Sequence, residues 1–262
     1  MITRVRTMLA ALYAVTGAGL WGFRFVVLGV VLGAMISSGQ AADSISANYI
    51  KTNFVAAEAR YRREPTNAEA AWQLGRAIFD RADLSTNNTE RALFADEGIA
   101  ACEIAVSREP KSAAAHYYLG MNLGQLARTK DLSALKIVKR MEKEFILACG
   151  LDEAFDYAGP QRNIGLLYRE APPVLSIGSK KDARQHLRRA LELAPQYPEN
   201  RLNLIEAYIK WSEEANGRVE LKGLDGMWNG ARTNFTGVAL VGSWDDWKER
   251  RAKARKVLEG NK

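Results

Sequence analysis

Cysteine and histidine are scarce in this sequence, since each occurs only twice in 262 residues. So few of these side chains count against disulfide-stapled scaffolds, zinc clusters and most histidine-based catalysis. Apolar residues make up 47% of the chain and charged residues 26%. This composition excludes mostly disordered, collagen-like and polytopic membrane proteins, and the length fits one or two globular domains.

Basic residues outnumber acidic ones by 37 to 30, which gives a formal net charge of +7. Three of the arginines, Arg4, Arg6 and Arg24, fall in residues 1–41, where no acid occurs. The rest of the chain has 34 basic and 30 acidic residues, a net charge of +4. So small an excess is weak evidence for a polyanionic partner, and we predict no nucleic-acid binding.

The amino-terminal segment has the parts of a secretory signal. Its basic start is followed by two apolar runs, 8–23 and 25–36, and by small residues that lead to Ala41 and Ala42. The second run is too short to cross about 30 Å of hydrocarbon as a helix, and a longer span would place Arg24 inside the membrane. We predict an export signal that is cleaved near Ala41 or Ala42. An uncleaved membrane anchor and a buried helix are the alternatives.

A short pattern recurs four times downstream of this segment. Each copy spans eight residues. Leu-Gly or a close variant occupies the fourth and fifth positions, and a large apolar residue occupies the eighth. The copies are Ala71–Ile78, His116–Leu123, Gln161–Tyr168 and, in degenerate form, Arg201–Tyr208. Their starts lie 45, 45 and 40 residues apart, as expected for a repeat architecture.

Prolines and small residues mark the boundaries of the same units. Pro65, Pro110 and Pro195 each fall six residues before a copy starts. Two of them end a second pattern, which reads Gly98, Cys102, Ala105, Pro110 and again Ala183, Leu187, Ala190, Pro195. Small residues let two helices approach closely, and proline ends a helix because it lacks a hydrogen-bond donor. We therefore expect two helices in each unit.

These features resemble the tetratricopeptide repeat (TPR) family, whose unit of 34 residues is a pair of antiparallel helices. The resemblance implies an all-α fold in which about four helix pairs form a right-handed helical solenoid over residues 44–216. Each pair would bury its apolar face by stacking on its neighbours. The units of this chain, at 40 to 45 residues, are longer than those of the family.

The third unit carries a more specific block of sequence. A connector that contains Pro172, Pro173 and Gly178 joins two predicted helices, and the second of these is Ala-rich and ends at Pro195. Residues 162–198 resemble the TatT family, the periplasmic T-component of tripartite (TRAP) transporters for hydrophobic ligands. The resemblance implies an exported protein that partners a periplasmic solute-binding protein and binds an apolar small ligand in a pore or groove. Similar repeats occur in eukaryotic microtubule-associated relatives.

The first helix of each pair would form the inner face of such a solenoid. In the repeat family, the groove positions lie two residues before, two after and five after the Leu of the pattern. Mapped on this sequence, the predicted partner- or ligand-binding groove consists of Trp72, Arg76, Phe79, Tyr117, Met121, Arg162, Leu166 and Arg169. Aromatic and arginine side chains often anchor interfaces. The alternative is that these side chains pack against the neighbouring unit.

Neither histidine nor cysteine forms a recognisable metal or catalytic motif. His116 and His186 lie on predicted helices without a second ligand at metal spacing, so we expect surface or groove histidines. Cys102 and Cys149 fall at expected packing positions, as two buried free thiols or, alternatively, as a disulfide. The T-component family is typically lipid-anchored through a cysteine at the cleavage site, a position that neither cysteine occupies. We predict no catalytic residue, metal ligand or cofactor.

Residues 217–262 break the repeat pattern. Six glycines fall between Gly217 and Gly242, which predicts a long loop or a small hairpin. Ser243 then resembles the start of a helix that carries six basic residues between Lys248 and Lys256. We predict a helix that caps the solenoid, with binding to anionic lipid or nucleic acid as the alternative.

The sequence as a whole predicts an exported, non-enzymatic TPR-like protein that binds a partner protein in the periplasm or cell envelope. The main hypothesis is an accessory, T-component-like subunit of a TRAP-type transporter for hydrophobic ligands, with any membrane association through the N-terminus. The alternative is a general cell-envelope scaffold without a transport role. An enzyme with a helical fold is a third hypothesis, for which the sequence shows no catalytic constellation.

Overall fold

The structure, a computed structural model, describes residues 36–130, 134–173 and 176–260. These residues form ten α-helices and one short 3-10 helix, and none of them lies in a strand. The helices are α2 (Ile36–Arg63), α3 (Ala68–Leu84), α4 (Asn88–Arg108), α5 (Ala113–Ala127), α6 (Ala134–Asp152), α7 (Phe155–Glu170), α8 (Lys180–Leu193), α9 (Pro198–Lys210), α10 (Glu214–Asn234), η1 (Val238–Leu240) and α11 (Val241–Glu259).

Successive helices pack in pairs, as the repeats predict. The four copies of the short pattern lie on α3, α5, α7 and α9, and each of these helices packs on the one that follows it. The recurrent glycine permits the close approach. A Cβ atom at Gly120 would lie 2.6 Å from the ring of Phe145 in α6, and one at Gly165 would lie 2.8 Å from Leu187 in α8. The predicted all-α fold of paired helices is therefore confirmed.

Local sequence determines where these helices begin and end. Pro65, Pro110 and Pro195 lie two residues beyond the last residues of α2, α4 and α8, as expected for a residue that stops a helix. The side chains of Asn67 and Ser112 accept hydrogen bonds from backbone N–H groups in the first turns of α3 and α5. Such caps satisfy donors that have no partner within the helix.

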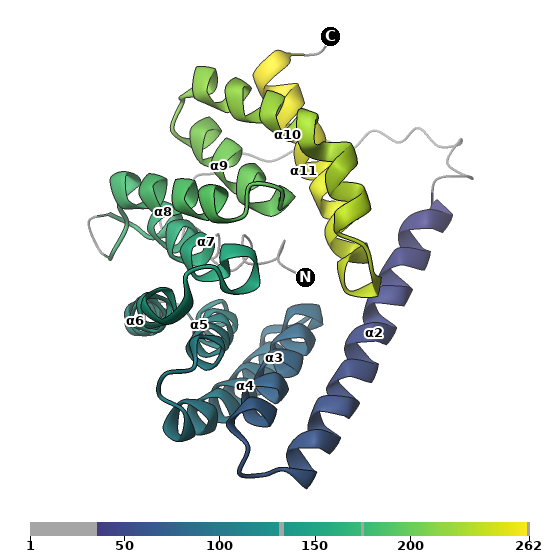
Figure 1. The fold of residues 1–262 in the computed structure, drawn as a ribbon, viewed down its shortest axis with the longest axis vertical. Helices are drawn as coiled ribbons and strands as arrows, with labels where there is room; N and C mark the ends of the chain where they lie inside the picture. Colours follow the sequence, from purple (N-terminus) through teal and green to yellow (C-terminus); the bar gives the residue numbers. More distant parts are fainter. Residues whose placement is uncertain (1–35, 131–133, 174–175, 261–262) are drawn as a thin grey trace, which may run out of the picture.

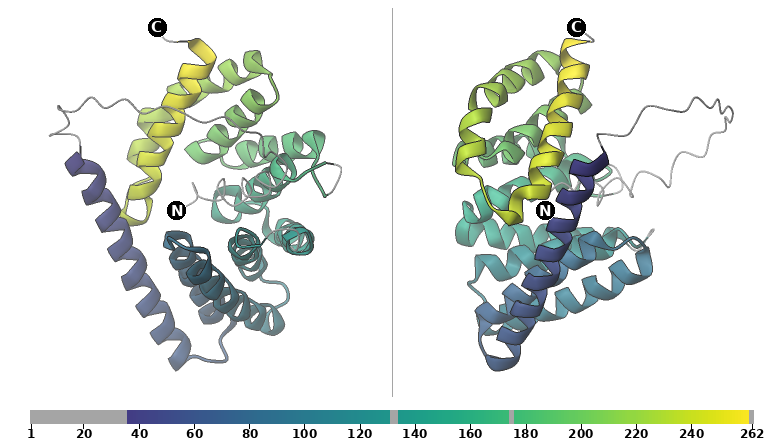
Figure 2. Two further views of the ribbon diagram at one scale, coloured as in Figure 1. Left: turned by 180° about the vertical axis from the view of Figure 1, so that it is seen from behind. Right: turned by 90° about the vertical axis from the view of Figure 1, so that its right-hand side faces the viewer.

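The helix pairs follow one another along an arc, and the first and last helices of the described chain, α2 and α11, meet across its open side (Figure 1). Helix α2 contacts α3, η1 and α11, while α11 also packs on α9 and α10. Figure 2 shows α2 beside α11 from two further directions. The contact between α2 and α11 closes the arc into a ring. We call α3, α5, α7 and α9 the inner helices, because they face its interior.

The prediction of a loop or hairpin in the Gly-rich segment is wrong, because most of this segment, up to Asn234, belongs to helix α10. Leu221, Leu224, Trp228 and Ala231 recur at helical spacing and bury one face of the helix, which packs on α9 and α11. At Gly217 a Cβ atom would lie 3.1 Å from a leucine of α11, so a small residue suits this contact. The apolar period outweighs the low helix propensity of glycine, about 1 kcal/mol per residue.

The basic helix predicted at the C-terminus is α11, which begins at Val241 rather than at Ser243. Ser243 is buried in its first turn and does not act as the N-cap. Arg250 is buried and pairs with acids of α9, and Arg251 pairs with Asp225 of α10. Basic side chains of this helix therefore hold it to its neighbours, which favours the capping role over binding to a polyanion.

Most of the predicted export segment, residues 1–41, lies outside the described residues. Helix α2 begins at Ile36 and includes Ala41 and Ala42. Among the helices of the described ranges, none is both long and apolar enough to cross a membrane.

Candidate binding site

Six of the eight residues predicted to line a groove are buried in the structure, and Trp72 and Arg76 of α3 remain partly exposed. The buried residues are Phe79, Tyr117, Met121, Arg162, Leu166 and Arg169, with exposed fractions of 6% or less. In the described part of the chain, the groove is filled at these six positions, and no open apolar channel passes them. The alternative interpretation, packing between neighbouring units, describes these six side chains.

Tyr117 shows why a predicted groove position becomes buried. The inner helices α5 and α7 approach closely at Gly159, where a Cβ atom would lie 2.7 Å from the Tyr117 hydroxyl oxygen. That hydroxyl donates a hydrogen bond to Asp156 Oδ2 at 2.9 Å and accepts one from Asn163 Nδ2 at 3.1 Å. Its ring packs edge-on against Phe155, with ring centroids 5.4 Å apart. Tyr117 is thus a contact between two inner helices and offers no surface to a partner.

Arg162 stabilises an unusual turn at the start of α7. Asp156, Tyr157 and Ala158 have φ angles of 50°, 56° and 63°. This left-handed conformation costs about 1–2 kcal/mol per non-glycine residue. The Arg162 guanidinium donates hydrogen bonds to the backbone oxygens of Tyr157 and Asp156, at 3.0 and 3.3 Å, and to Asn200 Oδ1 at 3.0 Å. Arg162 therefore holds the turn in place between α7 and α9.

A second buried polar cluster joins α9 to α11. Arg250 donates hydrogen bonds to Glu199 Oε1 at 2.7 Å and to Glu206 Oε1 at 2.8 Å, and the Trp247 indole donates to Glu199. Burial opposes ionisation of Glu199, but the nearby Arg250 holds the pKa of this carboxyl below its ordinary value. Arg169 donates to a backbone oxygen of α9 at 3.1 Å. These bonds fasten α11 to the last inner helices.

The accessible part of the predicted groove lies where α2 meets α3. Trp72 stacks on Tyr118 of α5, with ring centroids 5.7 Å apart and an interplanar angle of 2°. The Arg76 guanidinium carbon lies 5.7 Å from the centroid of the same Tyr118 ring. Arg76 also lines a recess of about 290 Å³ between α2 and α3, opposite Tyr49. Two of the predicted groove residues thus pack on the buried ring of Tyr118, and one of them, Arg76, borders an open recess.

A larger cavity lies where α2 meets η1 and the start of α11. It has a volume of about 910 Å³ and is lined by residues of α2, the end of α3, η1 and the first turns of α11. Asp80 of α3 lines this cavity, although its side chain is only 2% exposed. Neither of its carboxylate oxygens has a hydrogen-bond partner among the described residues. Burial raises the pKa of Asp80 to about 7, and the positive charge of Arg76 opposes that rise.

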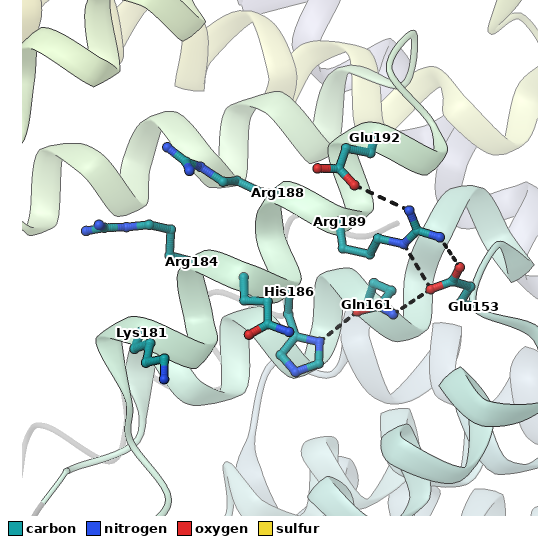
Figure 3. A pocket seen from close by; sticks show the side chains of 9 residues that line it. Glu153, Gln161, Lys181, Arg184, His186, Arg188, Arg189 and Glu192 are labelled. Carbon is teal, nitrogen blue, oxygen red and sulfur yellow. Dashed lines mark hydrogen bonds and ion pairs between the residues drawn. The ribbon is translucent and has the colours of Figure 1, made fainter.

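A third pocket, of about 560 Å³, lies along α8 (Figure 3). Its Arg189 pairs with Glu153 and with Glu192, and His186 Nδ1 lies 2.7 Å from Gln161 Oε1 (Figure 3). Burial lowers the pKa of His186, which favours its neutral form. Much of the polar lining is therefore already engaged by neighbouring side chains, and we assign no function to this pocket.

The histidines and cysteines form neither a metal site nor a disulfide in the described part of the chain. No group of three His, Cys, Asp or Glu side chains there could hold a metal ion. His116 is buried with its Nδ1 atom 2.6 Å from Glu144 Oε2, so the expected surface or groove position is wrong for this residue. Cys102 and Cys149 are free thiols, of which Cys102 is buried and Cys149 half-buried. Burial raises the pKa of Cys149 to about 12.

Comparison with known proteins supports the fold. The family model described as "Regulator of microtubule dynamics protein 1-3" matches residues 40–153, which is less than half of the chain. A solved structure of a thermophilic TPR protein from Thermus thermophilus matches 82% of this chain and 95% of that one, with a TM-score of 0.55 and 18% sequence identity. The chain has a TPR-like helical repeat fold. No curated protein matches it.

Proposed function

We propose that this chain is an exported, non-enzymatic TPR-like protein that binds a partner protein. The observation that carries the proposal is the fold, because stacked helix pairs build extended surfaces for protein recognition. The contact surface that we assign to the partner is the accessible part of the predicted groove, Trp72 and Arg76, which pack on the buried ring of Tyr118. Its aromatic and arginine side chains are of the types that anchor interfaces.

Our more specific hypothesis remains an accessory, T-component-like subunit of a TRAP-type transporter, whose partner is a periplasmic solute-binding protein. Its support is the resemblance of residues 162–198 to that family and the signal-like composition of residues 1–41. The right-handed sense of the solenoid and the periplasmic location stay predictions. The filled interior at Tyr117 and Leu166 speaks against an apolar ligand that passes along the inner helices. It favours the alternative of a cell-envelope scaffold without a transport role.

A binding experiment with matched variants tests the partner surface. The full chain is titrated with a purified periplasmic solute-binding protein of a TRAP transporter from the same organism, and the affinity is measured by calorimetry. Arg76→Ala should weaken binding at least tenfold, whereas Arg108→Ala removes the same charge from an exposed position of α4 and should leave binding unchanged.

The outcome also separates the two hypotheses. The scaffold hypothesis is supported if the wild-type chain does not bind the solute-binding protein but captures other envelope proteins, and if Arg76→Ala loses that capture. If Arg76→Ala binds every captured protein as the wild type does, the assigned surface is wrong. Cell fractionation tests the location separately, and recovery of the chain from the cytoplasm would contradict export.

A further inference from the structure

The 910 Å³ cavity between α2, α3 and the start of α11 has an excess of negative charge. Five carboxylates line it, from Asp80, Asp83, Asp245, Asp246 and Glu249, against the two guanidinium groups of Arg91 and Arg128. These residues come from α3, α4, the segment after α5, and α11, so the charge is assembled by the fold and not by one stretch of sequence. A cavity walled by charge of one sign attracts ligands of the opposite sign.

Four of the five acids already have cationic neighbours. Asp83 pairs with Arg128 at 3.3 Å, and Asp246 pairs with Arg250 at 3.3 Å. Asp245 and Glu249 pair with lysines of their own helix, at 2.9 and 2.6 Å. What distinguishes the cavity is therefore its fifth acid, Asp80.

Asp80 has no ion-pair partner among the described side chains, although the charge of Arg76 acts on it from a distance. Both of its oxygens lack a hydrogen-bond partner there, and it is 2% exposed. Arg76 precedes it by one helical turn, but the Arg76 guanidinium lies over the Tyr118 ring and no ion pair joins the two residues. A buried carboxylate without a partner is strongly disfavoured unless a cation or a hydrogen-bond donor reaches it. Its position on the cavity wall leaves room for a ligand to supply that donor.

The other walls specify what kind of cation fits. Ala47 and Ile50 of α2, Leu84 of α3 and Val238 of η1 contribute apolar surface, and Tyr49 contributes an aromatic ring. Such walls suit methylene groups, and an aromatic ring also attracts a cation. A metal ion fits less well, since no group of three His, Cys, Asp or Glu side chains in the described ranges is arranged to hold one.

We propose that this cavity binds an alkylammonium group, with the ammonium on Asp80 and the methylene chain against α2 and η1. The group could be supplied by a free aliphatic diamine or by a lysine side chain of a peptide, and both offer the same chemistry. The site does not depend on the partner surface at Arg76. Because the cavity walls include both α2 and α11, the bound ligand would also hold these two helices together and raise the melting temperature.

The test is calorimetric titration of the full chain with 1,4-diaminobutane and, in a second arm, with N-acetyl-lysine N-methylamide. The neutral control ligand is 1,4-butanediol, which has the same chain length without the charge. We expect saturable binding of at least one amine, no binding of the diol, and a rise in melting temperature with the amine alone. Whichever of the two amines binds the chain with the higher affinity identifies the source of the ammonium group.

Two variants locate the site. Asp80→Asn should weaken amine binding at least tenfold while the chain stays folded, and Ala47→Trp should do the same by filling the cavity with its charges intact. Asp96→Asn removes a charge from an exposed position of α4 and should change nothing. The proposal is overturned if neither amine binds saturably, if the diol binds as well as the diamine, or if Asp80→Asn binds the amine like the wild type.

Discussion

Replacing Asp80 with asparagine should stabilise the protein, and the gain should grow with pH. The Asp80 side chain is 2% exposed and its carboxylate oxygens have no hydrogen-bond partner among the described residues. Folding therefore moves this carboxyl from water into a site that disfavours its charged form. Asparagine has nearly the same shape and carries no charge, so the variant removes the electrostatic penalty with little change in packing.

The size of the effect follows from the pKa. Burial raises the pKa of Asp80 from 3.8 to about 7, which corresponds to about 4 kcal/mol at 1.36 kcal/mol per pKa unit. Below pH 3.8 the carboxyl is protonated in both the folded and the unfolded chain, so it imposes no penalty. As pH rises from 3.8 to about 7, the unfolded chain releases the proton first and stability falls. Asp80→Asn should therefore gain about 1 kcal/mol at pH 4.5 and about 4 kcal/mol at pH 8.

Urea unfolding at pH 4.5, 6 and 8 measures this difference. The matched control is Asp96→Asn, at an exposed position of α4, which should change the free energy of unfolding by less than about 0.5 kcal/mol at each pH. A constant difference between Asp80→Asn and the wild type at all three pH values would refute the reasoning, because a buried charge must act through its ionisation. Destabilisation of Asp80→Asn at pH 8 would show that the carboxylate has a cationic partner in the folded chain.

Three further predictions address packing, the ion network and the thiols. Gly120→Ala should destabilise by about 1–3 kcal/mol, because its Cβ atom would lie 2.6 Å from the Phe145 ring, whereas Gly226→Ala meets open space in α10 and should stabilise by about 0.5–1 kcal/mol in the same urea assay. Arg250→Met should lower the free energy of unfolding by about 3–5 kcal/mol, since it leaves buried carboxylates unpaired. Its control, Arg251→Met, breaks a half-exposed ion pair and should lower the free energy of unfolding by about 1 kcal/mol or less. Cys149 should be the first thiol to react with a disulfide reagent in the native chain, slowly because burial raises its pKa to about 12; rapid labelling, or native labelling that persists in Cys149→Ser, would contradict this.

Much of the fold could be predicted from the sequence because the repeats record helix-to-helix contacts. In three of the four copies of the short pattern, the glycine is small where two helices touch, and the prolines follow the helix ends. Helix α10 could not be found by the same reasoning, because the count of glycines outweighed the apolar row that begins at Leu221. Of its glycines, Gly226 and Gly230 face open space and disturb no contact, so composition was a poor guide to this segment.

The candidate site was predicted less well, because a groove position and a packing position use the same residue types. Tyr117 and Arg162 lie at the mapped groove positions, yet close approach of the inner helices buries both. Asp80 could have been noticed, since it continues the row Trp72, Arg76, Asp80 at four-residue spacing on one face of α3. The burial of Asp80 could not be predicted from the sequence, because the elements that cover it come from both ends of the repeat region.

The two candidate sites share one border, helix α2, and the way α2 is held explains why. Across the contact between α2 and α11, Arg250 and Glu199 fasten α11 to α9 through buried, charge-assisted hydrogen bonds. Among the described side chains of α2, none is fully buried. An element with few buried contacts opens at lower free energy than its neighbours, so the ring should open first at α2. A ligand that contacts α2 and α11 together binds only the closed ring and stabilises it by mass action. Ligand binding in the cavity is therefore coupled to closure of the ring at α2. Hydrogen exchange of the α2 amides should slow when the ligand fills the cavity.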